Sequence, residues 1–339
     1  MDVFQAPNSD DGVDQTPLVA LVQVTQKDME LVNTMILSRA NSHVELVPQL
    51  ARYLIKAGGK RLRPMLTLVA AKMFSEKQGY QINYAAAVEF MHNATLLHDD
   101  VVDESEMRRG QPAARKVWGN QASVLVGDFL LGQAFLMMVE TGDLAALEVL
   151  SRAAAIIAEG EVLQLSKAGD LTTSEADYEQ IIDAKTATLF EAATEVGAMA
   201  GDAPEMHRKA LARYGRELGL AFQLVDDALD YGGVRGALGK NTGDDLREGK
   251  MTLPVIIALA HASKTERAII TAALGDGALD DGVFGDVLAI INSYDGLKIT
   301  LERAHAHALA AREALDDLPA SALCTILADM SDFCVARAY

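Results

Sequence analysis

The chain has 339 residues, of which 50% are hydrophobic, and its formal net charge at pH 7 is −18. A chain this acidic is a poor candidate for binding nucleic acid or an anionic membrane through a broad basic face. Its two cysteines, Cys324 and Cys334, fit neither a metal-ligand spacing nor a disulfide framework, so we expect free thiols in a reducing cytoplasm.

The first residues differ in composition from the rest of the chain. Residues 1–16 are polar and acidic and show no helical periodicity, which predicts a disordered N-terminal tail. They lack the basic start and apolar core of a signal peptide. No run of about 18 uninterrupted apolar residues predicts a transmembrane helix. We therefore expect a cytoplasmic protein.

From Leu18 onward the hydrophobic pattern is helical. Aromatic residues make up only 5% of the chain, and alanine and leucine are abundant, which favours closely packed helices over sheets. No linker or fixed-period repeat divides the sequence. We predict helices near residues 17–40, 43–57, 63–76, 83–105, 120–139, 142–168, 174–200, 204–232, 251–262, 264–274, 283–293, 295–317 and 319–337. The pattern predicts one all-α domain over residues 17–339, with the polar chemistry gathered at one end of its helices.

The first acidic motif, His98 to Glu104, follows an apolar helical run. Asp99 and Asp103 are four residues apart and share one helical face. Carboxylates this dense repel one another unless cations lie among them. Magnesium prefers such oxygen ligands and keeps waters for a phosphate-bearing substrate. A solvated helix end is the alternative, but acidic groups at a helix C-terminus oppose the helix dipole.

A second acidic motif repeats this spacing. Asp226 and Asp230 lie four residues apart in Asp226-Asp227-Ala228-Leu229-Asp230, again at the end of an apolar helix. If the two Asp-Asp-x-x-Asp motifs face each other across a cavity, they could hold several magnesium ions. Such a cluster stabilises a departing diphosphate.

Basic residues are scarce and cluster beside these motifs. Arginine binds phosphate oxygens through two parallel hydrogen bonds, and lysine supplies a point charge. We predict phosphate-binding roles for Lys60, Arg63, Arg108, Arg109, Lys185, Lys240 and Lys250. We expect Arg61, in contrast, to be an ordinary surface cation.

These motifs together resemble those of the trans-isoprenyl diphosphate synthases, in particular the long-chain polyprenyl type that makes octaprenyl, solanesyl or decaprenyl diphosphate. The resemblance runs from about Lys56 to Pro254. It is carried, in the family's order, by Gly58-Gly59-Lys60-Arg61-Leu62-Arg63-Pro64, Leu96 to Glu104, Met107-Arg108-Arg109-Gly110, Gly127-Asp128, Lys185-Thr186, Phe222 to Asp227, and Gly249 to Pro254.

The resemblance implies an isoprenoid-synthase-type helical bundle around a deep central cavity, usually assembled as a homodimer. It also implies a prenyltransferase that extends an allylic diphosphate, such as farnesyl diphosphate, with successive isopentenyl diphosphate units. Magnesium would assist ionisation of the allylic substrate. The long all-trans product would serve as the side chain of a quinone such as ubiquinone.

The resemblance further implies a role for each motif residue. Magnesium would be bound by Asp99, Asp103 and Asp226, with Asp100, Asp227 and Asp230 beside them. The allylic diphosphate would be held by Arg108, Lys185, Thr186, Gln223, Lys240 and Lys250. Isopentenyl diphosphate would be held by Lys60, Arg63, His92 and Arg109.

Product length should depend on the residues below the first motif. In short-chain members of this family, bulky aromatic residues at the fourth or fifth position before the motif close the cavity. Here these positions are Thr95 and Ala94, which predicts an open tunnel and a long product, with Met91 and Phe90 as a deeper limit. Ordinary helix packing is the alternative, because small residues are common where helices cross.

Two other functions share part of this pattern. A terpene cyclase would also use an Asp-Asp-x-x-Asp helix and magnesium, but it would not need cations for a second diphosphate. A non-catalytic subunit of a heteromeric synthase would typically lack one or both acidic motifs, and this chain has both.

Overall fold

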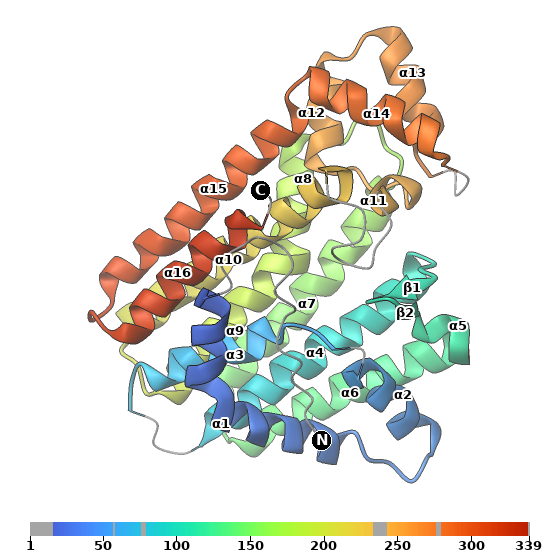
Figure 1. Cartoon of the computed structure of the whole chain (residues 1–339). Coiled ribbons are helices and arrows are strands. Elements are labelled where there is room, and N and C mark those ends of the chain that lie inside the picture. The colour runs from blue at the N-terminus through green and yellow to red at the C-terminus, as the bar shows by residue number, and fades with distance from the viewer. Residues whose placement is uncertain (1–15, 57, 76–78, 233–242, 276–278, 338–339) are drawn as a thin grey trace.

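The computed structural model describes residues 16–56, 58–75, 79–232, 243–275 and 279–337. The predicted tail, apart from Thr16, and Lys240 lie outside the described residues. The described chain is a bundle of helices with one two-stranded hairpin, so the predicted all-α fold is confirmed (Figure 1).

Most of the long helices lie side by side along the length of the molecule, and a group of shorter helices stands at one end (Figure 1). The long helices are α1 (Thr16–Arg39), α4 (Tyr80–Val102), α6 (Asn120–Glu140), α7 (Leu144–Lys167), α10 (Glu205–Gly232) and α15 (Gly296–Ala314). The other α-helices are α2 (Leu46–Lys56), α3 (Leu62–Lys72), α5 (Ala114–Trp118), α8 (Glu175–Ile182), α9 (Thr188–Ala200), α11 (Asp244–Arg247), α12 (Leu253–His261), α13 (Lys264–Ala273), α14 (Asp281–Ser293) and α16 (Ala322–Ala336). A 3₁₀ turn, η2 (Leu315–Asp317), follows α15.

Glycines let the central helices approach closely. A Cβ atom at Gly215 of α10 would lie 2.4 Å from the carbonyl oxygen of Phe190 in α9. A Cβ atom at Gly219, one turn later, would lie 2.7 Å from Cα of Ala187. Because real Cβ atoms do not approach other atoms this closely, both positions require glycine for α10 to pack against α9.

The segment predicted as one helix over residues 174–200 contains a change of helix type. It begins as expected, with a capping box in which Ser174 and Asp177 each bond to the other's backbone. Between α8 and α9, however, residues 183–187 form a π-helical turn, η1 (Asp183–Ala187). Single π turns inside α-helices are frequent at functional sites. This turn carries Lys185 and Thr186.

The hairpin and two short helices, α5 and α11, were not predicted from the sequence. Strand β1 (Met107–Arg108) pairs antiparallel with β2 (Gln111–Pro112). The two turn residues between them, Arg109 and Gly110, both have positive φ angles, of 53° and 75°. Such turns favour Asn-Gly or Asp-Gly, so Arg-Gly gave no hairpin signal.

One helix, α6, is long and apolar enough to cross a membrane, although the sequence alone predicted no such span. Length and composition alone do not identify a membrane-spanning helix, because core helices of soluble folds meet the same criteria. Here 44% of the apolar window is buried inside the structure, and α6 packs along α4. Part of its apolar surface is therefore a core contact.

Candidate active site

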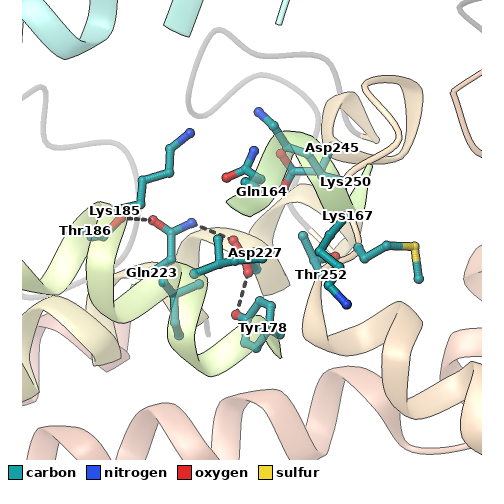
Figure 2. Close-up of a pocket in the computed structure, with 13 residues that line it drawn as sticks. Gln164, Lys167, Tyr178, Lys185, Thr186, Gln223, Asp227, Asp245, Lys250 and Thr252 are labelled. Atoms are coloured by element: carbon teal, nitrogen blue, oxygen red, sulfur yellow. Dashed lines mark hydrogen bonds between the residues drawn. The ribbon is translucent and has the colours of Figure 1, made fainter. Parts of the chain in front are cut away.

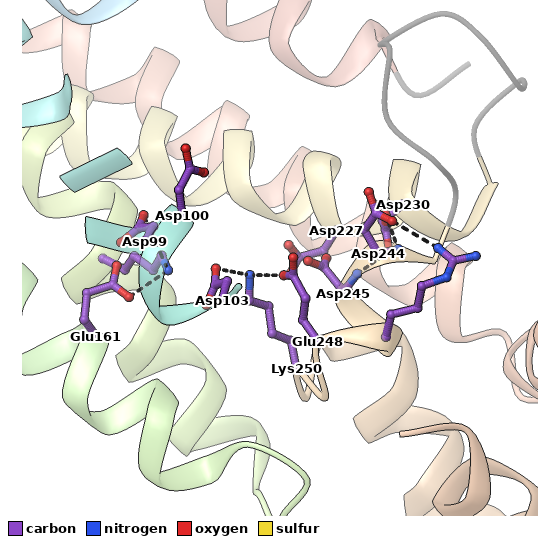
Figure 3. Close-up of polar contacts among 12 residues, drawn as sticks. Asp99, Asp100, Asp103, Glu161, Asp227, Asp230, Asp244, Asp245, Glu248 and Lys250 are labelled. Carbon is purple, nitrogen blue, oxygen red and sulfur yellow. Dashed lines mark hydrogen bonds and ion pairs between the residues drawn. The ribbon is translucent and has the colours of Figure 1, made fainter. Parts of the chain in front are cut away.

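The two acidic motifs lie on opposite sides of one site (Figure 3). Asp99 and Asp103 come from the C-terminal end of α4, and Asp227 and Asp230 come from the C-terminal end of α10. Between them stands Lys250, whose Nζ donates to Oδ2 of Asp103 at 2.8 Å and to Oε2 of Glu248 at 2.6 Å. The structure therefore brings together the two motifs that the sequence separates by more than a hundred residues.

Within the first motif, the middle aspartate has a different environment from its neighbours. Asp100 is fully buried, and its Oδ1 accepts a hydrogen bond from Nε of Arg108 at 2.8 Å. A second guanidinium nitrogen of Arg108 lies 2.5 Å from the same oxygen. Asp100 thus anchors the β-hairpin arginine to α4, while Asp99 and Asp103 keep their shared, partly exposed face.

The second motif repeats this division of roles. Asp227 is 3% exposed and lies in a chain of hydrogen bonds (Figure 2). The Tyr178 hydroxyl donates to its Oδ2 at 2.6 Å, and the Gln223 amide donates to its Oδ1 at 2.7 Å. The Thr186 hydroxyl in turn donates to Oε1 of Gln223 at 2.8 Å. This chain connects the π turn to α10.

The outer aspartates of the second motif are partly exposed. Asp226 lies 3.4 Å from the Arg337 guanidinium at the end of α16. Asp230 accepts backbone N–H groups from Asp244 and Asp245 at 3.2 and 3.1 Å, and thereby supports the start of α11. Negative charge near the N-terminus of a helix is stabilising.

A second lysine neutralises the first motif. Lys185 Nζ donates to Oε2 of Glu161 on α7 at 2.8 Å and lies 3.9 Å from Oδ2 of Asp99. Burial, and next the neighbouring Asp99, raise the pKa of Glu161 to about 7. Burial, and next Asp245, raise the pKa of Asp227 to about 8. In both cases burial is the main cause, and the neighbouring carboxylates add to it.

Lys250 remains charged in this environment. Burial would lower the pKa of its ammonium group, but Asp245, Asp103 and Glu248 outweigh burial and raise it. A permanently charged ammonium between two acidic motifs suits an anionic ligand that brings further cations with it.

The predicted cations for a second diphosphate lie together around the turn before α3. The guanidinium of Arg109 donates to the carbonyl oxygen of Gly58. The φ angle of Gly59, 148°, lies in the region that favours glycine, and a Cβ atom there would lie 2.7 Å from that guanidinium. Arg63 lies 3.5 Å from Nε2 of His92 and over the ring of Phe190, at 4.3 Å. Burial, and next Arg63, lower the pKa of His92 well below its usual range, so its ring is neutral at pH 7.

The prediction for Arg61 is wrong. Arg61 is only 8% exposed, and its guanidinium forms an ion pair at 2.7 Å with Glu89 of α4. Its backbone is left-handed, with φ at 50°, which turns the side chain into the protein. Sequence spacing gave no sign of this, because no helical period applies across the turn.

The donor atoms of the site suit a divalent metal ion. The available ligands are carboxylate oxygens, which magnesium and calcium prefer. Oδ2 of Asp100 and Oε1 of Glu161 are buried without a hydrogen-bond partner, so the site has unused acceptor oxygens. In the part of the chain that the structure describes, no three His, Cys, Asp or Glu side chains are already placed to hold an ion.

An open pocket lies beside the second motif (Figure 2). Its lining includes Lys185, Thr186, Gln223, Asp227 and Lys250. The four predicted chain-length residues do not line it. Phe90, Met91 and Ala94 are buried in the core, and Thr95 is half-buried.

Several residues in the site do not belong to any of the sequence motifs described above. They come from helices whose apolar pattern is ordinary, and only the packing of the helices brings them to the motifs. They are Glu161, Gln164, Lys167, Tyr178, Asp245 and Arg337.

Comparison with known proteins agrees with this arrangement. Residues 44–291 match the sequence model of the polyprenyl synthetase family. The chain is 47% identical to octaprenyl diphosphate synthase of Escherichia coli (strain K12), over 88% of this chain and 92% of that protein.

Two solved structures are similar over nearly their whole length. A polyprenyl synthase from Caulobacter crescentus, complexed with calcium and isoprenyl diphosphate, superposes with a TM-score of 0.91 at 48% identity, covering 95% of this chain and 98% of that one. A decaprenyl diphosphate synthase from Rhodobacter capsulatus gives a TM-score of 0.90 at 47% identity, covering 95% and 100%. The chain therefore belongs to the polyprenyl synthetase family and is a prenyltransferase.

Proposed function

We propose that this enzyme extends farnesyl diphosphate with successive isopentenyl diphosphate units and releases a long all-trans polyprenyl diphosphate for a quinone side chain. Relatives named for octaprenyl and decaprenyl products support a product of this class. The observation that carries the proposal is the position of Lys250, which contacts Asp103 and follows the second motif by only twenty residues. In this position the ammonium group of Lys250 lies between the two acidic motifs (Figure 3). A metal-bound diphosphate requires such a combination of carboxylates and a cation.

We assign metal binding to the outer aspartates of each motif. Asp99, Asp103, Asp226 and Asp230 would hold magnesium, because their side chains are partly exposed, whereas those of Asp100 and Asp227 are buried. Asp100 and Asp227 would support them, since both are buried and hydrogen-bonded to other side chains. When bound, magnesium supplies charge neutralisation of the diphosphate leaving group.

The cations divide into two groups by position. Lys185 and Lys250 lie against the acidic motifs, and Thr186 and Gln223 line the same pocket, so these residues would hold the allylic diphosphate. Arg108, which is hydrogen-bonded to Asp100, would also bind this diphosphate from the hairpin. Lys240, which lies outside the described residues, would bind it as well. Lys60, Arg63, His92 and Arg109 would hold isopentenyl diphosphate.

The chemistry follows from these contacts. Positive charge around the allylic diphosphate weakens its C–O bond, and the bond breaks to leave an allylic carbocation. The double bond of isopentenyl diphosphate, held next to the cation, supplies the electron pair of the new C–C bond. A proton then leaves the adjacent carbon for the released pyrophosphate, which restores a trans double bond. Neutral His92 takes up no proton in this scheme.

Product length would be set below the first motif. Ala94 and Thr95, five and four residues before Asp99 on α4, have small side chains, and Met91 and Phe90 lie further from the motif along the same helix. The growing chain would extend past the small residues. Substitution Ala94→Phe or Thr95→Tyr should shorten the product to farnesyl or geranylgeranyl length. An unchanged length, measured by mass spectrometry, would contradict this assignment.

We also propose that residues 17–339 form one cytoplasmic catalytic domain that functions as a homodimer. The support is the surface of α6, where Leu125 is 67%, Leu136 51% and Val139 58% exposed. An exposed apolar helix face of this kind is typical of subunit interfaces.

The test is an assay of the purified chain alone with magnesium, farnesyl diphosphate and labelled isopentenyl diphosphate. We expect a ladder of products that ends in the long-chain range, and loss of activity with EDTA. Product formed without isopentenyl diphosphate would indicate a terpene cyclase. No product in the complete mixture would support the non-catalytic subunit.

A further inference from the structure

A buried ion pair lies beneath the cations assigned to isopentenyl diphosphate. Nη1 of Arg61 lies 2.7 Å from Oε1 of Glu89, and their side chains are only 6% and 3% exposed. The same carboxylate oxygen accepts a hydrogen bond from Nδ2 of Asn93 at 2.9 Å. Removing two charges from water is costly, and hydrophobic residues often stabilise a fold equally well. A role beyond stability would explain such a pair at this position.

The pair joins the two elements that carry the cations. Arg61 is the N-cap residue of α3, between Lys60 and Arg63 in the turn. Glu89 lies three residues before His92 on α4 and therefore near the same helical face. Through this contact, the turn with Lys60 and Arg63 has a fixed position relative to His92.

The backbone of Arg61 also depends on the contact. Its φ of 50° is uncommon for a residue with a side chain, and such conformations persist when surrounding contacts enforce them. Arg61 makes no side-chain cap to its own helix. The left-handed turn sends the guanidinium inward to Glu89 and leaves Lys60 exposed.

Glu89 is also a buried carboxylate that acts on this concentration of positive charge. Burial lowers the pKa of Arg63 to about 10, and Glu89 is the strongest of the groups that oppose this change. Burial likewise lowers the pKa of Arg109, and Glu89 again opposes it. In the absence of a diphosphate, the cations would repel one another without this counter-charge.

We propose that Arg61 and Glu89 are positioning residues that hold the isopentenyl diphosphate half of the site in its binding geometry. Because Arg61 forms the ion pair with the carboxylate of Glu89, the guanidinium groups of Arg63 and Arg109 remain available for the substrate. This inference rests on the proposed function, because it assumes that these cations bind isopentenyl diphosphate.

The test is the double variant Arg61→Met/Glu89→Gln. It removes one charge of each sign, so the net charge beneath the site does not change and no unpaired ion remains buried. We expect the KM for isopentenyl diphosphate to rise about ten-fold or more, because small displacements of binding groups have effects of this size. The KM for farnesyl diphosphate should stay within about two-fold. Calorimetry with isopentenyl diphosphate alone should show the same loss of affinity.

Two further variants separate positioning from general stability. Arg61→Lys keeps the charge and should recover most of the affinity for isopentenyl diphosphate. Asp28→Asn/Lys72→Met removes another ion pair of α3, at 2.5 Å, and should change neither KM. If the first double variant does not fold, Glu89→Asp keeps both charges and withdraws the carboxylate by one methylene. It should then raise the same KM selectively.

An unchanged KM for isopentenyl diphosphate in a folded variant, or an equal rise for both substrates, would overturn the inference. Failure of the proposed function is a different result. In that case the wild-type protein would not incorporate isopentenyl diphosphate at all.

Discussion

At the scale of single residues, each acidic motif contains both partly exposed and buried carboxylates. The outer aspartates keep a face towards the site, whereas Asp100 and Asp227 are buried and bonded to other side chains. Spacing alone predicted which carboxylates share a helical face. It did not predict the partners of the middle aspartates, because Arg108 and Tyr178 lie on other elements.

The hydroxyl of Tyr178 allows a residue-scale prediction. Tyr178→Phe leaves Oδ2 of Asp227 buried without its donor, which should lower the free energy of unfolding by about 1–3 kcal/mol. Gln223 should lose its fixed orientation as well, so the KM for the allylic diphosphate should rise. Urea unfolding and steady-state kinetics measure the two effects. Tyr294→Phe, which removes a more exposed hydrogen bond to Glu266, is the matched control and should leave that KM unchanged.

At the scale of elements, the π turn η1 determines where Lys185 points. It is held from two sides. Asp183 forms two hydrogen bonds with Arg216 of α10, at 2.7 and 3.1 Å. On the α7 side, a Cβ atom at Gly160 would lie 2.7 Å from Cβ of Ala184. Helical periodicity predicted an uninterrupted helix here, since a π turn adds one residue without altering composition.

Gly160→Ala should therefore displace the turn and with it Lys185. We expect kcat/KM for the allylic diphosphate to fall by up to about a hundred-fold, as for other small misplacements of binding groups. Gly285→Ala is the matched control, because a Cβ atom there meets nothing within 4 Å. That variant should retain full activity and gain about 0.5–1 kcal/mol of stability. Equal activity in both variants would show that the turn tolerates the change.

The contact between α10 and α15 gives a pH-dependent prediction. Glu217 Oε2 lies 2.7 Å from Nδ1 of His307, and this hydrogen bond holds the pKa of Glu217 below its usual value. A carboxyl group with a lowered pKa binds fewer protons when folded than when unfolded, so stability falls as pH falls. The stability difference between wild type and Glu217→Gln should be present above about pH 4.5 and shrink below it. Chemical unfolding at pH 6, 5, 4 and 3 would detect this, and a difference independent of pH would contradict it.

At the scale of the whole molecule, the bundle leaves the apolar face of α6 uncovered. The same helix packs along α4, which carries the first acidic motif. A dimer formed through α6 would therefore also stabilise the position of α4.

Charged substitutions on this face should separate the subunits. We expect Leu136→Asp with Val139→Lys to shift the protein from dimer to monomer in sedimentation velocity, because both side chains are more than half exposed in the single chain. Leu309→Asp, on α15 and 58% exposed, is the control that should remain dimeric. A monomeric wild-type protein would exclude the interface.

The amino-acid sequence alone was enough to predict the helical class, the positions of most helices to within a few residues, and the two acidic motifs with their nearby cations. These properties are local, since helical periodicity and the four-residue spacing of carboxylates do not depend on distant contacts. The burial of Arg61, the contact of Lys185 with Glu161 and the place of Lys250 between the two motifs became evident only from the folded chain. Each of these depends on which helix faces which, and that choice is made by packing between segments far apart in the chain.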